Sequence, residues 1–258
     1  MPKTYKILVT GRVQGVGFRP HVFKLANTFQ LLGTVSNNEE GVIIYLTGEP
    51  DVVGSFYESL TSNPPKASKI KEHHLHETDY QNFDGFSIVP SVKSGKLNLQ
   101  LTPDFAICDD CKKEVADKNN RRYHYPFTTC VNCGPRWAIT NSFPFERNHT
   151  NLESFEMCNT CANEYKNPAD RRFHSQTNTC FDCGIELKLS SADGTPISTD
   201  HILKKTAELI KAGNILAIKN TSGYLLCCDA NNPEVIKKLR DRKNRPTKPF
   251  AILYPSLS

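Results

Sequence analysis

The sequence predicts an α+β protein in three parts: a ferredoxin-like domain over residues 1–91, a duplicated four-cysteine region over 105–187, and an incomplete α/β lobe over 198–258. Three observations lead to this prediction. The apolar spacing of the first part gives the element order β-α-β-β-α-β. Eight of the ten cysteines fall into four C-x-x-C pairs inside an internal repeat. The last part begins a new alternation of helix and strand.

The first part alternates between period-two and helical spacing. The expected elements are a strand through 5–9 ending at Gly11, a helix over 19–30 ended by Gly33, strands over 34–37 and 42–46 around a turn at 38–41, a helix through 53–60, and strands over 70–78 and 86–89. This order is the split βαβ arrangement, with one sheet and both helices on one of its faces. We also expect an extra edge strand.

The stretch GRVQGVGFRP, residues 11–20, lies between the first strand and the first helix. Its glycines let the backbone turn tightly and bring several N–H groups to one point. The following helix directs its positive N-terminal end there, and Arg19 can bind two phosphate oxygens at once. We interpret the stretch as a phosphate-binding loop. The alternative is a glycine-rich turn with solvent-exposed arginines.

This loop, its helix and the segments GTVSN (33–37) and Gly41-Val42 resemble the acylphosphatases. The resemblance covers about 90 residues. It implies that Arg19 and Asn37 are catalytic and that the backbone of the loop binds phosphate, through Val13, Gln14, Gly15, Val16, Gly17, Phe18 and Arg19.

The chemistry of such a site needs few groups. An acyl phosphate has a good leaving group, so Arg19 and the loop N–H groups suffice to hold and neutralise the phosphoryl oxygens. The Asn37 amide can orient the attacking water in line. The alternative for Asn37 is a turn-forming residue, since Asn37-Asn38 leads into a hairpin.

The cysteine pairs are spaced C-x2-C-x18-C-x2-C, then a gap of 24 residues, then the same unit again. Flanking residues repeat as well, so the region is an internal duplication. Each copy supplies four thiolates for one tetrahedral zinc ion. We therefore predict two structural zinc fingers, over 108–133 and 158–183, with these ligands: Cys108, Cys111, Cys130, Cys133, Cys158, Cys161, Cys180 and Cys183. We prefer pairing within each copy, and interleaved pairing is the alternative.

Each copy carries two arginines and a histidine shortly before its second cysteine pair. They are Arg121, Arg122 and His124 in one copy, and Arg171, Arg172 and His174 in the other. The histidines are unneeded as ligands because four cysteines fill each site. The arginines can contact nucleic acid or a phosphorylated ligand. We favour solvated arginines, because no aromatic stacking platform surrounds them.

The third part begins after a linker at 190–196. We expect a helix through 202–210, capped by Thr199 or Asp200 and ended by Gly213, buried strands over 215–218 and 225–229, a helix from Pro233, and a strand over 250–253. The motif KxRPxKP places Lys243, Arg245 and Lys248 beside rigid prolines. It resembles the nucleotide-phosphate motif of YrdC-like domains, and a plain basic loop is the alternative.

The combination of an acylphosphatase-like domain and the eight-cysteine array resembles the HypF family of carbamoyltransferases, which mature [NiFe]-hydrogenases. The resemblance implies hydrolysis of carbamoyl phosphate to carbamate and phosphate. It further implies adenylation of the carbamate, with ATP needed only by a complete YrdC-like domain, and transfer to the C-terminal cysteine of a partner protein. We expect this chain to be an N-terminal fragment. The competing function is a zinc-finger module that binds RNA or an acidic protein, on an acylphosphatase-like platform.

Composition limits the remaining classes. No run of 18 apolar residues occurs, and the start MPKTYKILVT lacks an apolar signal segment. We therefore expect a cytoplasmic protein without membrane contact. The net charge of +5 is mild and dispersed, so nucleic acid is not an expected partner.

Overall fold

The computed structural model describes residues 1–91, 98 and 100–254. It divides into two compact units, Met1–Ile185 and Glu186–Ser258, and each is described by itself. The last residues of the predicted third domain, 255–258, lie outside the described part. The first two predicted domains fall together in the first unit.

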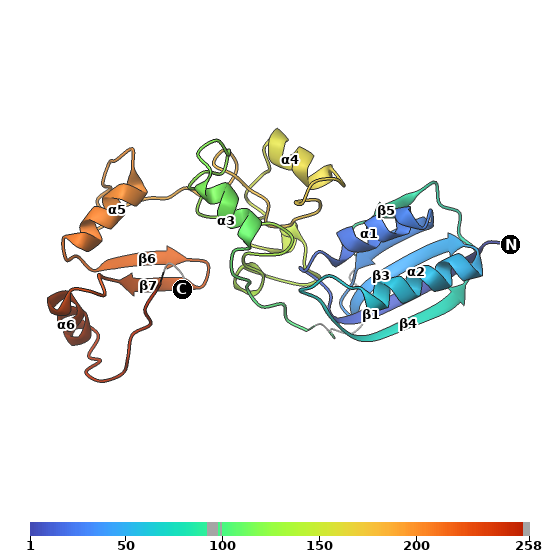
Figure 1. Cartoon of the computed structure of the whole chain (residues 1–258), viewed down its shortest axis with the longest axis horizontal. Coiled ribbons are helices and arrows are strands. Elements are labelled where there is room, and N and C mark those ends of the chain that lie inside the picture. The colour runs from blue at the N-terminus through green and yellow to red at the C-terminus, as the bar shows by residue number, and fades with distance from the viewer. Residues whose placement is uncertain (92–97, 99, 255–258) are drawn as a thin grey trace. The chain divides into compact units, whose positions relative to one another are not determined.

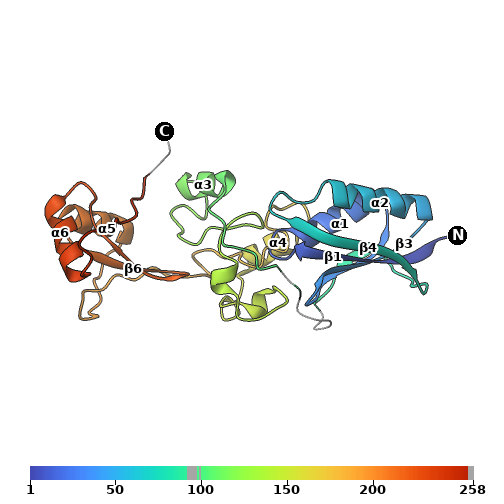
Figure 2. The same cartoon turned by 90° about the horizontal axis from the view of Figure 1, so that it is seen from below.

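The first unit begins with a five-stranded sheet in the order β4-β1-β3-β2-β5. Its strands are β1 (Lys3–Arg12), β2 (Leu32–Asn37), β3 (Gly41–Gly48), β4 (Lys69–Thr78) and β5 (Phe86–Ile88). Strand β5 runs parallel to β2, and the other pairs are antiparallel. Helices α1 (Phe18–Thr28) and α2 (Pro50–Ser62) cover one face of this sheet (Figures 1 and 2). The predicted ferredoxin-like fold with an extra edge strand is confirmed.

The core of this domain lies between the sheet and the two helices. Alternate residues of the central strands point into it because side chains on a strand alternate between faces. Ile7, Val9 and Ile44 are fully buried there, against Val22 of α1 and Phe56 of α2. This packing holds the end of β1 and the start of α1 in place, and the glycine-rich loop joins these two ends.

The prediction that Gly33 ends the first helix is wrong. Helix α1 stops at Thr28, and the chain turns through Gln30, which has a positive φ of 54°. Gly33 lies inside β2 with φ 153°, and a Cβ there would stand 1.9 Å from the carbonyl oxygen of Tyr45. The glycine is thus required by the close approach of β2 to β3.

The rest of the first unit is the cysteine region, residues 105–185. It contains two short α-helices and two 3-10 turns: α3 (Asp109–Ala116), α4 (Asn159–Lys166), η1 (Trp137–Ile139) and η2 (Arg147–His149). A small core of Tyr125, Phe127, Ile139 and Leu152 lies within it. Most of the backbone is irregular, which is typical of a region held together by metal ligands and side-chain hydrogen bonds.

The second unit contains α5 (Ile202–Lys211), β6 (Leu216–Asn220), β7 (Gly223–Cys227) and α6 (Pro233–Arg242). Helix α6 begins as predicted, with Pro233 in its first turn and Asn232 accepting a hydrogen bond from the Val235 amide. For α5, however, the N-cap is His201 and no side chain caps it, so the predicted cap at Thr199 or Asp200 is wrong.

Two strand predictions in the second unit are also wrong in part. Strands β6 and β7 form a two-stranded hairpin whose apolar side chains, such as Ile218 and Leu225, are exposed and not buried. Residues 250–253 form no strand. An apolar pattern predicts burial only when another layer covers it, and a lone hairpin has two uncovered faces.

Gly33 and Gly54 make a matched pair for testing these backbone constraints. We expect Gly33→Ala to lower the free energy of unfolding by more than about 2 kcal/mol, because the new Cβ meets a backbone oxygen. Gly54 lies in α2 with open space around it, so Gly54→Ala should raise stability by about 0.5–1 kcal/mol. Urea unfolding measures both, and equal stabilities for the two variants would contradict the assignment.

Candidate active site and metal centres

The glycine-rich loop places an anion-binding backbone at the start of α1. Gly15 and Gly17 adopt left-handed conformations with φ of 70° and 75°. Gly17 is the N-cap of α1, and no side chain caps the helix. The first N–H groups of the helix are therefore directed at a ligand site, at the positive end of its dipole.

Arg19 and Asn37 meet at one small cavity of about 30 Å³. Arg19 is the second residue of α1, and Asn37 is the last residue of β2. Both side chains are almost completely buried. The predicted phosphate-binding residues that line the same cavity are Val13, Gln14, Gly15, Gly17 and Phe18. Val16 is the exception, because its side chain belongs to the hydrophobic core.

Residues of the cysteine region form the other wall of this cavity. The covering segment, residues 143–147, lies over Arg19 and Asn37. The Arg19 guanidinium donates to both carboxylate oxygens of Glu146, over 2.5 and 3.2 Å. Asn37 Nδ2 donates to the carbonyl oxygen of Phe145 at 3.2 Å, and the Phe145 amide donates to Gln14 Oε1 at 2.9 Å. The cavity is therefore shared between the two predicted domains.

The buried guanidinium of Arg136 joins the cavity to the first cysteine group. It donates to the carbonyl oxygen of Gly15 in the loop. It also donates to the carbonyl oxygens of Cys133, Cys130 and Val131 at 3.0–3.1 Å. Burial lowers the pKa of Arg136 to about 10, which still leaves it charged at neutral pH.

The sequence pattern does not single out Glu146, Phe145 or Arg136. All three lie in the 24-residue gap between the copies. One feature of the sequence could have drawn attention to them. The segment that contains them follows the first copy and has no counterpart after the second, which suggests a role outside the repeat.

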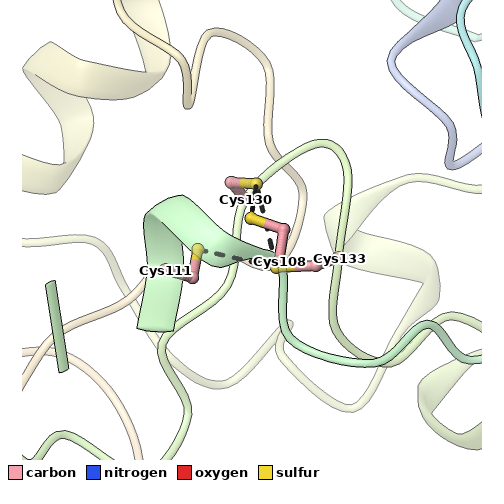
Figure 3. A group of neighbouring side chains, drawn as sticks. All are labelled: Cys108, Cys111, Cys130 and Cys133. Carbon is pink, nitrogen blue, oxygen red and sulfur yellow. Dashed lines mark hydrogen bonds between the residues drawn. The ribbon is translucent and has the colours of Figure 1, made fainter. Parts of the chain in front are cut away.

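The eight predicted metal ligands form two groups. Cys108, Cys111, Cys130 and Cys133 meet in one group, and Cys158, Cys161, Cys180 and Cys183 in the other. Figure 3 shows the first group, with its thiols converging from the start of α3 and from a tight turn. Each group comes from one copy, so the interleaved alternative is excluded.

The sulfur positions fit zinc. A tetrahedral ion with Zn–S bonds of about 2.3 Å places its sulfurs about 3.8 Å apart. The Sγ atoms of Cys108 and Cys130 are 3.7 Å apart, and those of Cys130 and Cys133 are 3.8 Å apart. The second group repeats these separations, with 3.7 Å for Cys158–Cys180 and 3.8 Å for Cys180–Cys183.

The interpretation of the repeated arginines as solvated side chains is wrong. Arg122 is 2% exposed and Arg172 3%. Arg122 pairs with Glu164, and Arg172 pairs with Glu114, so each arginine reaches the other copy. Burial alone would raise the pKa of Glu164, but Arg122 and Asn178 outweigh it and hold that pKa at about 2.

The neighbouring arginines extend this exchange to the cysteine groups. Arg121 of the first copy donates to Cys180 Sγ at 2.9 Å. Arg171 of the second copy donates to Cys111 Sγ at 3.1 Å. A zinc ion with four thiolates carries a net charge of −2, so a guanidinium from the other copy neutralises part of it. Each copy thus forms its own cysteine group, while its arginines contact a glutamate and a cysteine of the other copy. We call this reciprocal contact the arginine exchange.

The two histidines are not ligands of these groups, which consist of cysteines alone among the described residues. His124 and His174 both have positive φ, 59° and 54°. His174 lines the cavity beside Arg19. Burial and the charge of Arg19 lower the pKa of His174 to about 4, so its ring is neutral at pH 7.

The predicted nucleotide-binding residues follow α6 in the second unit. Lys243 is the C-cap of the helix and is exposed, as is Lys248. Arg245 donates to the carbonyl oxygens of Lys248 and Pro249 at 3.2 and 2.7 Å, and its guanidinium lies near the Phe250 ring. Arg245 thus organises the turn, and its role toward a nucleotide stays a prediction.

Three family models match the chain in order. The Acylphosphatase model covers residues 5–88, the HypF finger model covers 107–140 and 157–190, and the Telomere recombination model (Sua5, YciO and YrdC) covers 208–258. In the described part of the chain, no helix has the length and apolar character needed to cross a membrane.

Relatives match over nearly the whole chain. Carbamoyltransferase HypF of Synechocystis sp. is 45% identical over 100% of this chain and 34% of its own length. Probable carbamoyltransferase HypF of Methanocaldococcus jannaschii is 45% identical over 96% of this chain and 33% of its own. The crystal structure of a full-length HypF in its phosphate- and nucleotide-bound form superposes with a TM-score of 0.90 at 39% identity, over 97% of this chain and 33% of that one.

These findings, together with the cavity and the cysteine groups, define an acylphosphatase domain built onto a paired zinc-finger region. The chain belongs to the HypF family, and it spans about a third of the length of the relatives that it matches.

The arginine exchange predicts that the two metal centres depend on each other. We expect about two zinc ions per chain, and we expect Cys111→Ser/Cys133→Ser to release zinc from the second group at least tenfold faster under a chelator. A tenfold change corresponds to about 1.4 kcal/mol. The loss of charge-assisted hydrogen bonds between the copies, such as that from Arg121 to Cys180, is large enough to produce this change. A chromogenic chelator follows the release, with Cys227→Ser as control. Release from the second group at the parent rate would contradict this dependence.

His174 predicts a loss of stability in mild acid. Its folded pKa of about 4 lies below the ordinary histidine value of 6.5, so the unfolded chain binds a proton first. Stability should fall as pH drops from about 6.5 toward 4, by roughly 1 kcal/mol for this group after allowing for solvent screening. Urea unfolding at pH 7 and pH 5 measures it in parent, His174→Asn and the exposed-site control His76→Asn. Asparagine tolerates positive φ, and an equal loss in both variants would refute the assignment.

Proposed function

We propose that this chain hydrolyses acyl phosphates, and carbamoyl phosphate in particular, at the cavity between the glycine-rich loop and the cysteine region. The observation that carries the proposal is the convergence of the loop, Arg19 and Asn37 on one cavity. The acylphosphatase match over residues 5–88 and the carbamoyltransferase names of the relatives support it.

The phosphoryl group would be held by the backbone and by one cation. The uncapped N–H groups at the start of α1 would donate to a phosphoryl oxygen, and the planar Arg19 guanidinium would donate to two more. These donors are already oriented before the substrate arrives, because the loop is fixed by the packing of β1 and α1. Such preorganised donors stabilise the charge that develops on the phosphoryl oxygens during transfer.

Asn37 would orient the attacking water. Its Nδ2 donates to the carbonyl oxygen of Phe145, which fixes which amide atom faces the cavity. Its Oδ1 is buried and has no hydrogen-bond partner among the residues that the structure describes. This free acceptor can take an O–H of a water and direct the oxygen at phosphorus. Water adds as the P–O bond to the acyl group breaks, giving carbamate and inorganic phosphate from carbamoyl phosphate.

The metal centres would have a structural role. Each group of four thiolates would occupy all four coordination positions of a tetrahedral zinc ion and would leave none open for a substrate. Zinc would supply folding energy to a region with a small apolar core. Arg136 connects the first cysteine turn to the carbonyl oxygen of Gly15, so an ordered turn would also keep the glycine-rich loop in place.

We further propose that the carbamate is used within a [NiFe]-hydrogenase maturation pathway in the cytoplasm. A complete YrdC-like domain would adenylate it with ATP, and the carbamoyl group would pass to the C-terminal cysteine of a partner protein. The names of the relatives and the Telomere recombination match over 208–258 support this sequence of steps.

The alternative function, binding of RNA or an acidic protein by the zinc fingers, has lost its main support. The repeated arginines that suggested it are engaged with Glu114, Glu164 and cysteine sulfurs inside the region.

Phosphate release from carbamoyl phosphate tests the proposal. We expect Arg19→Ala to lower the rate by at least about 100-fold and Asn37→Ala by about 10- to 100-fold, since each removes a group that contacts the reacting atoms. Lys24→Ala, an exposed change on the same helix, should leave the rate unaltered. Zinc content confirms folding. Equal rates for Arg19→Ala and the parent, or no release by the parent, would reject the proposal.

A further inference from the structure

Glu146 occupies the anion-binding face of Arg19. The carboxylate accepts from both terminal nitrogens of the guanidinium, in the two-point geometry that a phosphoryl group would use. The side chains are 8% and 15% exposed, so water screens the pair weakly. Ser91 Oγ also donates to Glu146, which fixes the rotamer of the carboxylate.

A second anion cannot use the same donors while this carboxylate is in place. Both terminal nitrogens of Arg19 already donate to Glu146, in the two-point contact that a phosphoryl group would take. A phosphoryl group that binds Arg19 in this way must therefore displace Glu146. Two negative charges on one guanidinium in a buried site would also repel each other strongly.

The backbone on both sides of Glu146 is firmly held, so the movable part is its side chain. Phe145 is held through its N–H by Gln14 and through its carbonyl by Asn37. The Arg147 amide donates to Gln176 Oε1 at 2.9 Å, and its guanidinium donates to the carbonyl oxygens of Gln176, Asn178 and Phe155. A rotamer change of one carboxylate is then enough to open and close the anion site.

We propose that Glu146 competes with phosphate for Arg19 and thereby speeds the release of inorganic phosphate. This inference rests on the proposed function. The loop and Arg19 contact the phosphoryl group of the substrate and also the inorganic phosphate that leaves. Binding that is equal for both lowers KM and slows product release without lowering the barrier. Glu146 weakens both by a similar amount, and it returns to Arg19 as phosphate departs.

Isothermal titration with inorganic phosphate tests the inference on the full chain. We expect Glu146→Gln to bind phosphate at least about tenfold more tightly than the parent, because the competing charge is gone. The KM for acyl phosphate should fall, and inhibition by phosphate should strengthen by a similar factor. Ser91→Ala keeps the charge and loses only the hydrogen bond, so its effect should be smaller and in the same direction. Glu153→Gln, an exposed change in the same region, should change nothing.

The outcomes separate this inference from the proposed function. Unchanged or weaker phosphate binding by Glu146→Gln overturns the inference, and it leaves the function standing if the parent still releases phosphate from carbamoyl phosphate. Tighter binding by the variant without turnover by the parent rejects the function and supports the inference. Should Glu146→Gln lose zinc or fold, Glu146→Asp shortens the side chain by one methylene, and tighter phosphate binding is expected there too.

Discussion

The buried guanidinium of Arg136 connects the two halves of the first unit. It holds a carbonyl of the glycine-rich loop on one side and carbonyls of the first cysteine turn on the other. A charge buried this deeply is tolerated only because its donors are matched by several acceptors. The geometry of the loop therefore depends on the cysteine turn, and the turn depends on its ligands. Together with the contacts of residues 145 and 146, Arg136 joins the acylphosphatase domain and the cysteine region, which form one compact unit although each has its own sequence pattern.

The cavity owes its chemistry to both partners in that unit. The acylphosphatase side contributes an anion-binding backbone, a cation and an amide. The cysteine region contributes the carbonyl that orients the amide and the carboxylate that occupies the cation. The other amide atom, Asn37 Oδ1, has no hydrogen-bond partner in the described part of the chain. The covering segment thus orients the amide of Asn37 and pairs with the cation of Arg19, both of which belong to the other domain.

Much of this arrangement could be predicted from the sequence, because its determinants are local. A glycine-rich turn between a strand and a helix and repeated C-x-x-C pairs are visible within a few residues. Glu146 could not be predicted, since it meets Arg19 across 127 positions of sequence. The repeated arginines are visible in the sequence, but the glutamate that each one meets in the other copy is not. The sequence alone therefore predicts exposed arginines where Arg122 and Arg172 are buried. The apolar pattern of β6 and β7 predicted strands correctly but not their exposure, since burial depends on what packs against them.

The reciprocal arginines also limit how such a region can arise. Each copy contributes a guanidinium pair that its own fold does not use, together with a glutamate that its own arginines do not reach. A single copy would thus be complete only beside a second one related to it by a two-fold axis. Each copy therefore has toward the other the role that a second subunit has in a symmetric dimer. The 24-residue connection between the copies has no part in this reciprocity, and it contains the segment that reaches the acylphosphatase cavity.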